Sequence, residues 1–440
     1  MAQVIIVGAG LAGMGAAYSL KKAGVDAKVL EALPEAGGRV RSLQWHGAWI
    51  DAGAEFITDR DLVYFQDAIT TLGLGKDLLT YPGSEITFDV WKDNRAHPLK
   101  ITEPASFFSF GAISRKGKFQ LLRMLPLMLQ QMRANGNTDY EPWRAAWCDD
   151  ESVETWLKRI APEFLEYVVE PTFELYCGYQ PHDYGRAMFA YLMTQYRQTI
   201  VTTFREGLGQ LTRALAKHLN VVTGADVERV QLTSENGQAN TVTYRYNGNL
   251  QHEQADFVIM AVPGSKVLGL VEGLGSEQRA FFEQVRYTPH ELPFLKLSQR
   301  PDGLPNRLYF PRLEDQDIAG VGYEPASTTP DVEFFRVSMK NAFNRRMMDK
   351  PDAENTAAII DAACRRYPQI RDLIVDSYVS RWKEALPLFP AGYLRALDKF
   401  RQLPAQHNVA FAGDYLAGPS TGAAYVTGQR AAEEILARLH

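Results

Sequence analysis

Three glycines and a glutamate near the start of the sequence have the spacing of a dinucleotide site. Gly8, Gly10 and Gly13 follow an apolar run over residues 4–7, and Glu31 lies 18 residues past the last glycine. The first glycine permits a tight turn, the second lets a pyrophosphate approach the backbone, and the third lets helix and strand pack closely. A carboxylate at position 31 would accept hydrogen bonds from the ribose hydroxyls. The acid alone does not separate NAD from FAD.

The elements that position these residues follow from the hydrophobic pattern. Residues 4–7 are apolar and largely β-branched, which predicts a buried parallel strand. The glycines open a helix that continues to residue 20, and residues 27–30 predict a second strand that ends at Glu31. Together these segments form a βαβ unit, so we predict an α/β fold with a Rossmann-type dinucleotide-binding domain.

A second glycine-rich segment separates FAD from NAD. Glu31 is followed, after a short gap, by Gly37, Gly38 and Arg39. The hydroxyl residue Ser42 and then the segment 51–56 come next in the sequence. In this signature the chain resembles the flavin-containing amine oxidase superfamily, which includes monoamine and polyamine oxidases, protoporphyrinogen oxidases and carotenoid desaturases. The resemblance implies FAD as cofactor, with Arg39 as a forked cation for its pyrophosphate. It also assigns these residues to the cofactor: Gly38, Gly53, Ala54, Glu55 and Phe56.

Two later segments extend the resemblance. A glycine-rich helix start at residues 207–211 precedes strands over 225–230 and 256–262, and the strand over 408–412 leads into Asp414 and a helix over 423–439. In the family the aspartate meets the ribityl or phosphate end of FAD. The last helix points its N-terminus at the pyrimidine edge of the flavin, where its dipole stabilises negative charge. The resemblance thus adds these cofactor residues: Val227, Val262, Gly413, Asp414, Thr421, Gly422 and Ala423.

The domain organisation follows from where these segments lie. We predict a discontinuous FAD-binding domain over residues 1–80, 205–272 and 400–440. An inserted substrate-binding domain of mixed sheet plus helices is predicted over 81–204 and 273–399. Within it, apolar residues recur at helical spacing from Phe119 to Met132. This stripe predicts a buried core helix, although peripheral contact with a membrane or a lipophilic entrance stays open.

The resemblance also suggests three catalytic residues. Many amine-oxidising members carry a strand lysine bonded through water to the flavin N5, and Lys296 lies in a comparable place, or else is an exposed strand lysine. Trp382 begins a stretch to Gly392 that is similar to one over the flavin face in protoporphyrinogen oxidases. Tyr393 corresponds to one of the two tyrosines that wall the amine in monoamine oxidases, but Ser420 stands in the place of the other. Residues 382–393 contain no cysteine, so FAD is expected to bind non-covalently.

The predicted reaction is hydride abstraction from a bulky, lipophilic cyclic or polyene substrate, with O2 as the acceptor of electrons from the flavin. Oxidation of a C–N bond in an amine or amino acid is the alternative, followed by a redox-neutral isomerase or a non-catalytic flavoprotein. The lipophilic substrate is inferred from the stretch over residues 382–392 and from aromatic residues in the helical insertion, namely Phe173, Tyr176, Tyr179, Phe189, Tyr191 and Tyr196.

Composition excludes other classes. The net charge of −5 gives no sign of a nucleic-acid partner, and the eight histidines show no HExxH spacing, so no metal site is predicted. The GxSxG run at 418–422 lacks a suitable histidine after Ser420, since only His440 follows. Three cysteines without a CxxC pair fit a reducing compartment. The first strand leaves no room for a signal peptide and no apolar run is long enough to span a bilayer, so a cytoplasmic location is expected.

Overall fold

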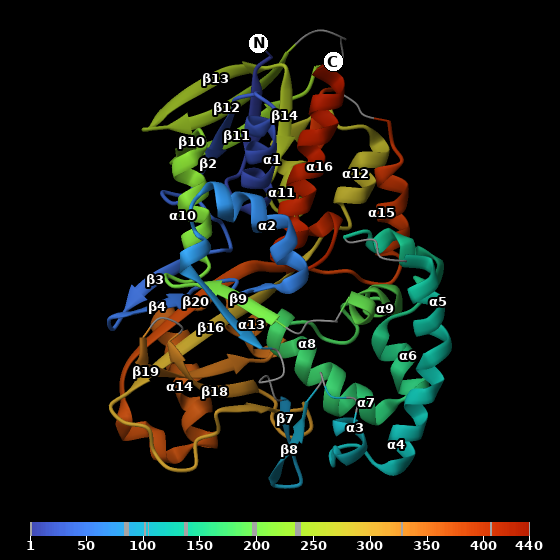
Figure 1. The fold of residues 1–440 in the computed structure, drawn as a ribbon, viewed down its shortest axis with the longest axis vertical. Helices are drawn as coiled ribbons and strands as arrows, with labels where there is room; N and C mark the ends of the chain where they lie inside the picture. Colours follow the sequence, from blue (N-terminus) through green and yellow to red (C-terminus); the bar gives the residue numbers. More distant parts are fainter. Residues whose placement is uncertain are drawn as a thin grey trace.

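A parallel sheet brings together segments from the start, middle and end of the chain (Figure 1). The computed structural model describes residues 2–82, 88–100, 103, 105–135, 140–195, 200–233, 239–326, 329–404 and 407–439. The parallel sheet runs in the order β10-β2-β1-β14-β21. Its strands are β1 (Val4–Val7), β2 (Ala27–Glu31), β10 (Val221–Thr223), β14 (Phe257–Met260) and β21 (Val409–Phe411). All neighbouring pairs are parallel, as the βαβ pattern predicted.

Two apolar cores cover the two faces of this sheet. Ile6 and Val29 point into one core and Ile5 and Leu30 into the other, because successive side chains of a strand alternate between faces. The first core includes α1 (Leu11–Lys22), α2 (Asp59–Thr71), α10 (Gly209–His218) and α16 (Thr421–Leu439). The second includes α11 (Gly264–Leu270), α12 (Ser276–Phe282), α15 (Tyr393–Arg401) and a smaller sheet of β11 (Ala225–Gln231), β12 (Asn240–Tyr246), β13 (Asn249–Ala255) and β15 (Val271–Glu272).

The first and last helices of the parallel-sheet layer lie in close contact, as Figure 1 shows for α1 and α16. A Cβ atom on Gly428 would come within 2.0 Å of the Ala12 carbonyl oxygen, and one on Gly15 within 2.6 Å of the Tyr425 carbonyl oxygen. Larger residues at either glycine would therefore separate the helices. This contact between protein helices joins the two ends of the sequence and does not depend on a cofactor.

A second, mixed sheet carries the other half of the molecule. It runs in the order β20-β16-β19-β18-β17-β7-β8. Helices α13 (Asn341–Met347) and α14 (Asp352–Arg366) pack against it. Its strands are β7 (Phe88–Lys92), β8 (Arg95–Leu99), β16 (Tyr287–Leu297), β17 (Arg307–Tyr309), β18 (Ile318–Ala326), β19 (Thr329–Met339) and β20 (Ile374–Pro387).

Short sheets connect these two layers. The hairpin of β3 (Ser42–Trp45) and β4 (Ala48–Asp51) packs its Ala48 and Ile50 side chains against Leu292, Phe294 and Phe334 of the mixed sheet. A further sheet pairs β9 (Ile200–Phe204) with β5 (Ile57–Thr58) and β6 (Leu78–Pro82). These short sheets lie between the parallel sheet and the mixed sheet, next to the predicted cofactor segments in the sequence.

The helical insertion has an aromatic core and an apolar outer face. Phe173, Tyr179 and Phe189 are buried in one cluster, and Tyr191 is buried in another, so these side chains stabilise the fold. Tyr196 lies outside the described residues. The insertion contains α3 (Ser106–Ser109), α4 (Arg115–Gln120), η3 (Leu121–Met124), α5 (Leu125–Asn135), α6 (Val153–Ile160), α7 (Pro162–Phe164), α8 (Glu170–Cys177) and α9 (Arg186–Gln195).

The prediction of a buried helix over residues 119–132 is wrong. Met124 is buried, but Phe119, Leu122, Leu125 and Leu129 are exposed. Helical periodicity identified the helix but did not show that both its faces are apolar. Among the described residues, none of the helices combines the length and apolar character that crossing a bilayer requires.

Candidate functional site

The glycine turn between β1 and α1 leaves its backbone open to a ligand. Gly8 has a φ of +101°, and a Cβ on Gly13 would lie 1.9 Å from the Gly8 carbonyl oxygen, so both positions require glycine. Around Gly10, by contrast, no heavy atom of the described residues outside its chain neighbours lies within 4 Å of a Cβ position. Within the part of the chain that the structure describes, no side chain caps the α1 N-terminus. The unpaired N–H groups of the first turn and the space at Gly10 suit a pyrophosphate.

Glu31 lies beside this turn at the end of β2. Its Oε2 accepts a hydrogen bond from the Ala9 N–H at 2.7 Å, and its Oε1 accepts one from the Leu33 N–H at 2.9 Å. These bonds fix the orientation of the carboxylate. Since a carboxylate offers about four lone-pair positions, Glu31 retains acceptor capacity for the predicted ribose hydroxyls.

An ion pair joins the two terminal cofactor segments. Arg39 Nη1 lies 2.6 Å from Asp414 Oδ2 and also donates to the Ala385 carbonyl oxygen at 2.8 Å. Asp414 is 4% exposed, and Gly38, next to Arg39, approaches Gly10 with its Cβ position 3.4 Å from the Gly10 Cα. The GGR segment, the glycine turn and the C-terminal aspartate therefore lie together in the fold, and their contact with one cofactor stays a prediction.

Tyr287, at the start of β16, contacts both residues of the Arg39–Asp414 ion pair. The Arg39 guanidinium lies 5.4 Å from the centre of the Tyr287 ring, and the Tyr287 hydroxyl donates to Asp414 Oδ1 at 3.4 Å. The Gly264 N–H donates to the same hydroxyl at 3.1 Å. Burial, followed by the charge of Asp414, raises the pKa of Tyr287 well above its usual value, so the phenol stays neutral. Tyr287 links the mixed sheet to the cofactor segments.

The segment over residues 51–56 lies between the two layers. A Cβ on Gly53 would collide with the Arg39 carbonyl oxygen at 2.0 Å, and the Ala54 N–H donates to that oxygen at 2.9 Å. Glu55 forms a bidentate pair with Arg336 of β19, with one contact of 2.8 Å. Phe56 is half-buried. Gly53 and Ala54 thus support the GGR segment, whereas the Glu55 carboxylate binds the mixed sheet.

The N-terminus of α16 faces a buried acid. Ser420 caps the helix by accepting from the Ala423 N–H at 3.0 Å, and Thr421 Oγ1 donates to Asp61 Oδ2 at 3.5 Å. A Cβ on Gly422 would lie 2.3 Å from Asp61 Oδ1. The helix dipole stabilises this carboxylate. Contact of Thr421, Gly422 and Ala423 with a flavin stays a prediction.

Three further predicted cofactor residues lie on the smaller sheet or just after strands of the parallel sheet. Val227 on β11 is buried in the core that contains Leu30 and Met260. Val262 follows β14, and its Cγ1 lies 3.5 Å from a Cβ position on Gly8. Gly413 has its N–H bonded to Thr427 Oγ1 at 2.9 Å, next to Asp414. Val262 and Gly413 therefore border the glycine turn and the ion pair, and a contact of Val227 with adenine stays a prediction.

The register of β16 against β20 decides which predicted catalytic residues lie together. Trp382 is paired with His290, and Lys296 with Asp376. Six residues of strand between His290 and Lys296 span about 20 Å, and the Lys296 ammonium lies 5.6 Å from the centre of the Phe334 ring. Trp382 Nε1 donates to the Ala52 carbonyl oxygen at 2.6 Å. Trp382 therefore contacts the 51–56 segment, and Lys296 lies farther along the strand pair.

Tyr393 is the first residue of α15, and its side chain lies in the core. It is 1% exposed, its hydroxyl donates to the Tyr415 carbonyl oxygen at 3.1 Å, and its ring packs edge-on against Phe389. A side chain used in this way stabilises the fold. Its role as a wall of the substrate site gains no support from these contacts and stays a prediction.

His290, across the strand pair from Trp382, is a residue that sequence reasoning missed. It is 7% exposed, and its Nδ1 has no hydrogen-bond partner among the described residues. Burial and the neighbouring Arg336 lower the pKa of His290 to about 4. The imidazole is therefore neutral at physiological pH. No motif marked it, because only the strand register brings it beside Trp382.

We predict that Lys296→Met changes the rate of substrate oxidation by less than about twofold. The reason is that Lys296 lies about six residues along the strand from the partner of Trp382, which separates the two side chains along the sheet. Stopped-flow measurement of flavin reduction tests this, with Trp382→Phe as the comparison. A fall of tenfold or more in Lys296→Met with unchanged flavin content would restore the catalytic role.

A pH-dependent stability difference is expected from Asp51. Its Oδ1 accepts from the Leu208 N–H at 2.9 Å and from Ser42 Oγ at 2.5 Å. Burial raises the pKa of Asp51 to about 7, with a further contribution from Glu55. The folded state then holds this proton more tightly than the unfolded state, so stability is lost as the pH rises through 7. Asp51→Asn keeps the acceptor, and its Tm relative to wild type should rise by a few degrees between pH 6 and pH 8.5. An equal Tm difference at both pH values would contradict this.

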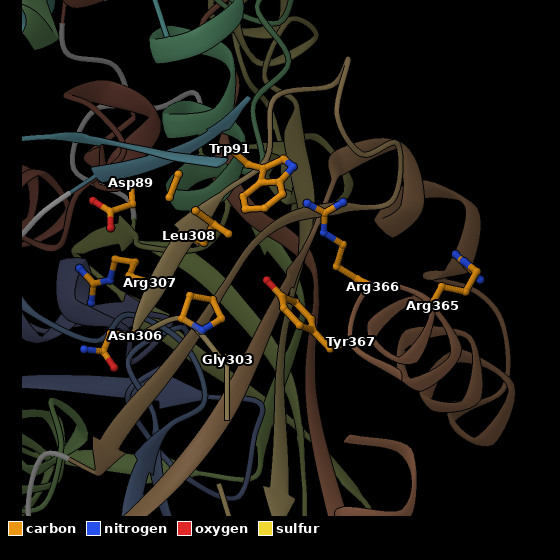
Figure 2. A pocket seen from close by; sticks show the side chains of 11 residues that line it. Asp89, Trp91, Gly303, Asn306, Arg307, Leu308, Arg365, Arg366 and Tyr367 are labelled. Carbon is orange, nitrogen blue, oxygen red and sulfur yellow. The ribbon is translucent and has the colours of Figure 1, made fainter. Parts of the chain in front are cut away.

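The described residues also contain a cavity of about 540 Å³ away from this site (Figure 2). Figure 2 shows it between Trp91, Arg307 and Tyr367, at the β17–β7 end of the mixed sheet. Arg366 at its wall stacks on Trp91 and Phe310. The cavity lies four strands from β20, or about 19 Å. It is therefore separate from the Arg39–Asp414 ion pair.

A comparison with protein families matches residues 11–436 to the family described as flavin containing amine oxidoreductase. The chain belongs to this family. The match includes Gly13, Arg39 and the C-terminal ion-pair residue Asp414, and it begins just after Gly8 and Gly10. The protein is accordingly an oxidoreductase enzyme with the α/β fold that the sequence predicted.

Known members of the flavin amine oxidoreductase family differ in substrate. Protoporphyrinogen oxidase 2, chloroplastic/mitochondrial, of Arabidopsis thaliana is 21% identical, covering 99% of this chain and 94% of that protein. A triple mutant of putrescine oxidase has a TM-score of 0.77 at 20% identity, with 99% of each chain covered. Cyclohexylamine oxidase from Brevibacterium oxydans has a TM-score of 0.75 at 18% identity, covering 100% of this chain and 99% of that one. The two structures establish a shared fold.

Proposed function

We propose that this chain binds FAD non-covalently and oxidises a bulky, lipophilic cyclic or polyene substrate, with O2 as electron acceptor. A flavin in this family supplies hydride acceptance from the substrate and the onward transfer of two electrons. The chain's own residues bind and orient the cofactor and position the substrate.

The described residues fit such a dinucleotide. The open backbone at Gly10 and the uncapped α1 N-terminus offer N–H groups to a pyrophosphate. Arg39 supplies a cation held in place by Asp414, and Glu31 supplies acceptors for ribose hydroxyls. Non-covalent binding is supported by the absence of cysteine from residues 382–393.

The observation that favours a lipophilic substrate over an amine is the pairing of His290 with Trp382. Amine-oxidising members commonly carry a lysine near the flavin. Here the residue opposite Trp382 is a buried histidine whose pKa is lowered to about 4, followed on the same strand face by Leu292 and Phe294. Leu292 and Phe294 are covered by the β3–β4 hairpin, so the feature that bears on the substrate is the neutral imidazole opposite Trp382, which suits a carbon skeleton without a cationic centre. The near-full-length similarity to a protoporphyrinogen oxidase agrees with this choice.

Anaerobic reduction of the purified protein tests the proposal. Bands near about 375 and 450 nm are expected from a bound flavin, and acid precipitation should release all of it into the supernatant. A porphyrinogen should bleach the 450 nm band at least tenfold faster than putrescine or cyclohexylamine. Admission of O2 should restore the band with formation of H2O2.

Each part of the proposal has its own contrary result. Bleaching by an amine but not by a porphyrinogen would establish C–N oxidation instead. Flavin that stays with the precipitate would show a covalent link, and a reduced band that persists in air would exclude O2 as acceptor. A bound flavin that no substrate bleaches, with isomerised product formed, would identify a redox-neutral enzyme.

A further inference from the structure

The outer face of the helical insertion is apolar. Phe119, Leu122, Leu125, Leu129 and Met132 are spaced three or four residues apart along α4, η3 and α5, and their exposed fractions run from 74% at Phe119 to 46% at Met132. We call these five residues the apolar ridge. A surface helix normally presents polar residues to water, so a continuous exposed apolar row indicates a binding surface.

The opposite face of the same helical segment holds it on the protein. Met124 is buried, and Leu121 and Met128 pack against the core of the insertion. Figure 1 shows α4 and α5 along the outer edge of the molecule, away from the parallel sheet. Lys118 Nζ donates to the Phe108 carbonyl oxygen at 2.7 Å, which holds Phe108, itself 83% exposed, beside α4. The buried face thus holds the helical segment on the insertion and leaves the apolar ridge exposed to solvent.

The helical segment that carries the ridge has basic residues only, and the Glu163 carboxylate contacts its start by accepting from the Ser114 N–H and hydroxyl, each at 2.6 Å. Residues 105–138 contain five basic residues and no acidic one, although the whole chain has a net charge of −5. Arg115, Lys116, Arg123 and Arg133 are exposed, and within the described part of the chain no carboxylate forms an ion pair with them. A helix with apolar residues flanked by Lys and Arg has the composition that binds in the headgroup region of an anionic membrane.

We propose that the apolar ridge and its flanking cations dock this protein on the surface of a membrane that contains anionic lipid. The ridge follows a helical segment of about 30 Å at 1.5 Å per residue, which would lie in the plane of the interface. Docking of two copies through this face would bring both sets of cations together, so charge favours lipid over a second copy. This inference does not rest on the proposed substrate.

Flotation of the full-length, flavin-loaded protein with lipid vesicles tests the proposal. Vesicles of phosphatidylcholine alone are compared with vesicles containing 30% phosphatidylglycerol. The bound fraction is expected to be at least tenfold higher with phosphatidylglycerol and to fall severalfold at 0.5 M salt, because salt screens the charge attraction. Wild-type protein that does not float with anionic vesicles would overturn the proposal.

Two variants separate the apolar and charged contributions. The ridge variant Leu122→Ser, Leu125→Ser, Leu129→Ser should lose at least tenfold in binding. The charge variant Arg115→Gln, Arg123→Gln, Arg133→Gln should lose the preference for phosphatidylglycerol. Matched exposed residues elsewhere, Val63, Leu313 and Val375, are 73%, 70% and 59% exposed, and their triple serine variant should bind as wild type does.

The remaining outcomes also decide the question. If the matched control loses as much binding as the ridge variant, general surface hydrophobicity explains the result and the proposal fails. If the wild type does not float but is a dimer that the ridge variant converts to a monomer, the ridge is a contact between copies. Circular dichroism and flavin absorbance of each variant identify any that do not fold, in which case the charge variant provides the test.

Discussion

Replacement of Asp414 by alanine is expected to yield protein that retains less than a tenth of the wild-type flavin and unfolds at lower temperature. Asp414 accepts from Arg39 at 2.6 Å, from the Tyr287 hydroxyl at 3.4 Å and from the Tyr415 N–H at 3.1 Å. Arg39 is half-buried, so the loss is expected to fall below the about 3–5 kcal/mol that removing one partner of a fully buried ion pair typically costs. Arg39 would then lose the orientation on which the predicted cofactor contact depends.

An exposed ion pair provides the control for this prediction. Asp349 and Lys383 lie 2.5 Å apart with side chains 82% and 71% exposed, and exposed pairs contribute about 0–1 kcal/mol. Asp349→Ala should keep its flavin and its Tm. Absorbance of the purified variants and thermal unfolding provide both measurements. Full flavin content in Asp414→Ala would show that the ion pair does not support the cofactor site.

Replacement of Lys340 by methionine is expected to give the largest loss of stability without touching the cofactor segments. Lys340 is 1% exposed, and its Nζ lies 2.9 Å from Glu170 and 3.3 Å from Glu174. The same ammonium donates to the Phe310 carbonyl oxygen at 2.9 Å. Without it, two buried carboxyl groups face each other with no cation, and we expect a loss of about 3–5 kcal/mol.

Glu170→Gln is the matched variant for this cluster. Burial, against the opposing charge of Lys340, raises the pKa of Glu170, and the adjacent Glu174 raises it further. A proton held in this way stabilises the folded state at low pH and is lost as the pH rises through the raised pKa. Glu170→Gln should therefore lose much less stability than Lys340→Met in urea unfolding. Equal losses in the two variants would contradict this account.

Local sequence patterns predicted the parts of the fold that local physics determines. The glycine turn, β2 ending at Glu31 and the helix after Asp414 each depend on neighbouring residues, and the structure has all three. The convergence of Arg39 with Asp414 followed from the family resemblance. It had no local signal, since the two residues are 375 positions apart.

What the sequence did not predict depends on contacts between distant elements. The apolar periodicity over residues 119–132 is the same whether the helix is buried or exposed. The sequence pattern therefore did not indicate that Phe119 and Leu125 are exposed. The β16–β20 pairing contains two irregularities, near Thr288 and near Lys296. A register of this kind cannot be read from either strand alone, which is why His290 was missed.

The arrangement of the parallel sheet has a consequence for biosynthesis. Its first strand β1 and its last strand β21 come from opposite ends of the chain, and both flank β14. During synthesis the glycine turn exists long before Asp414 and α16 do, so the partly made protein has a phosphate cradle without the acid that orients Arg39. Cofactor capture must then wait for the end of translation, and a chain that stops before Asp414 is expected to be colourless. The yellow colour of a preparation would thus report how much of it was made to completion.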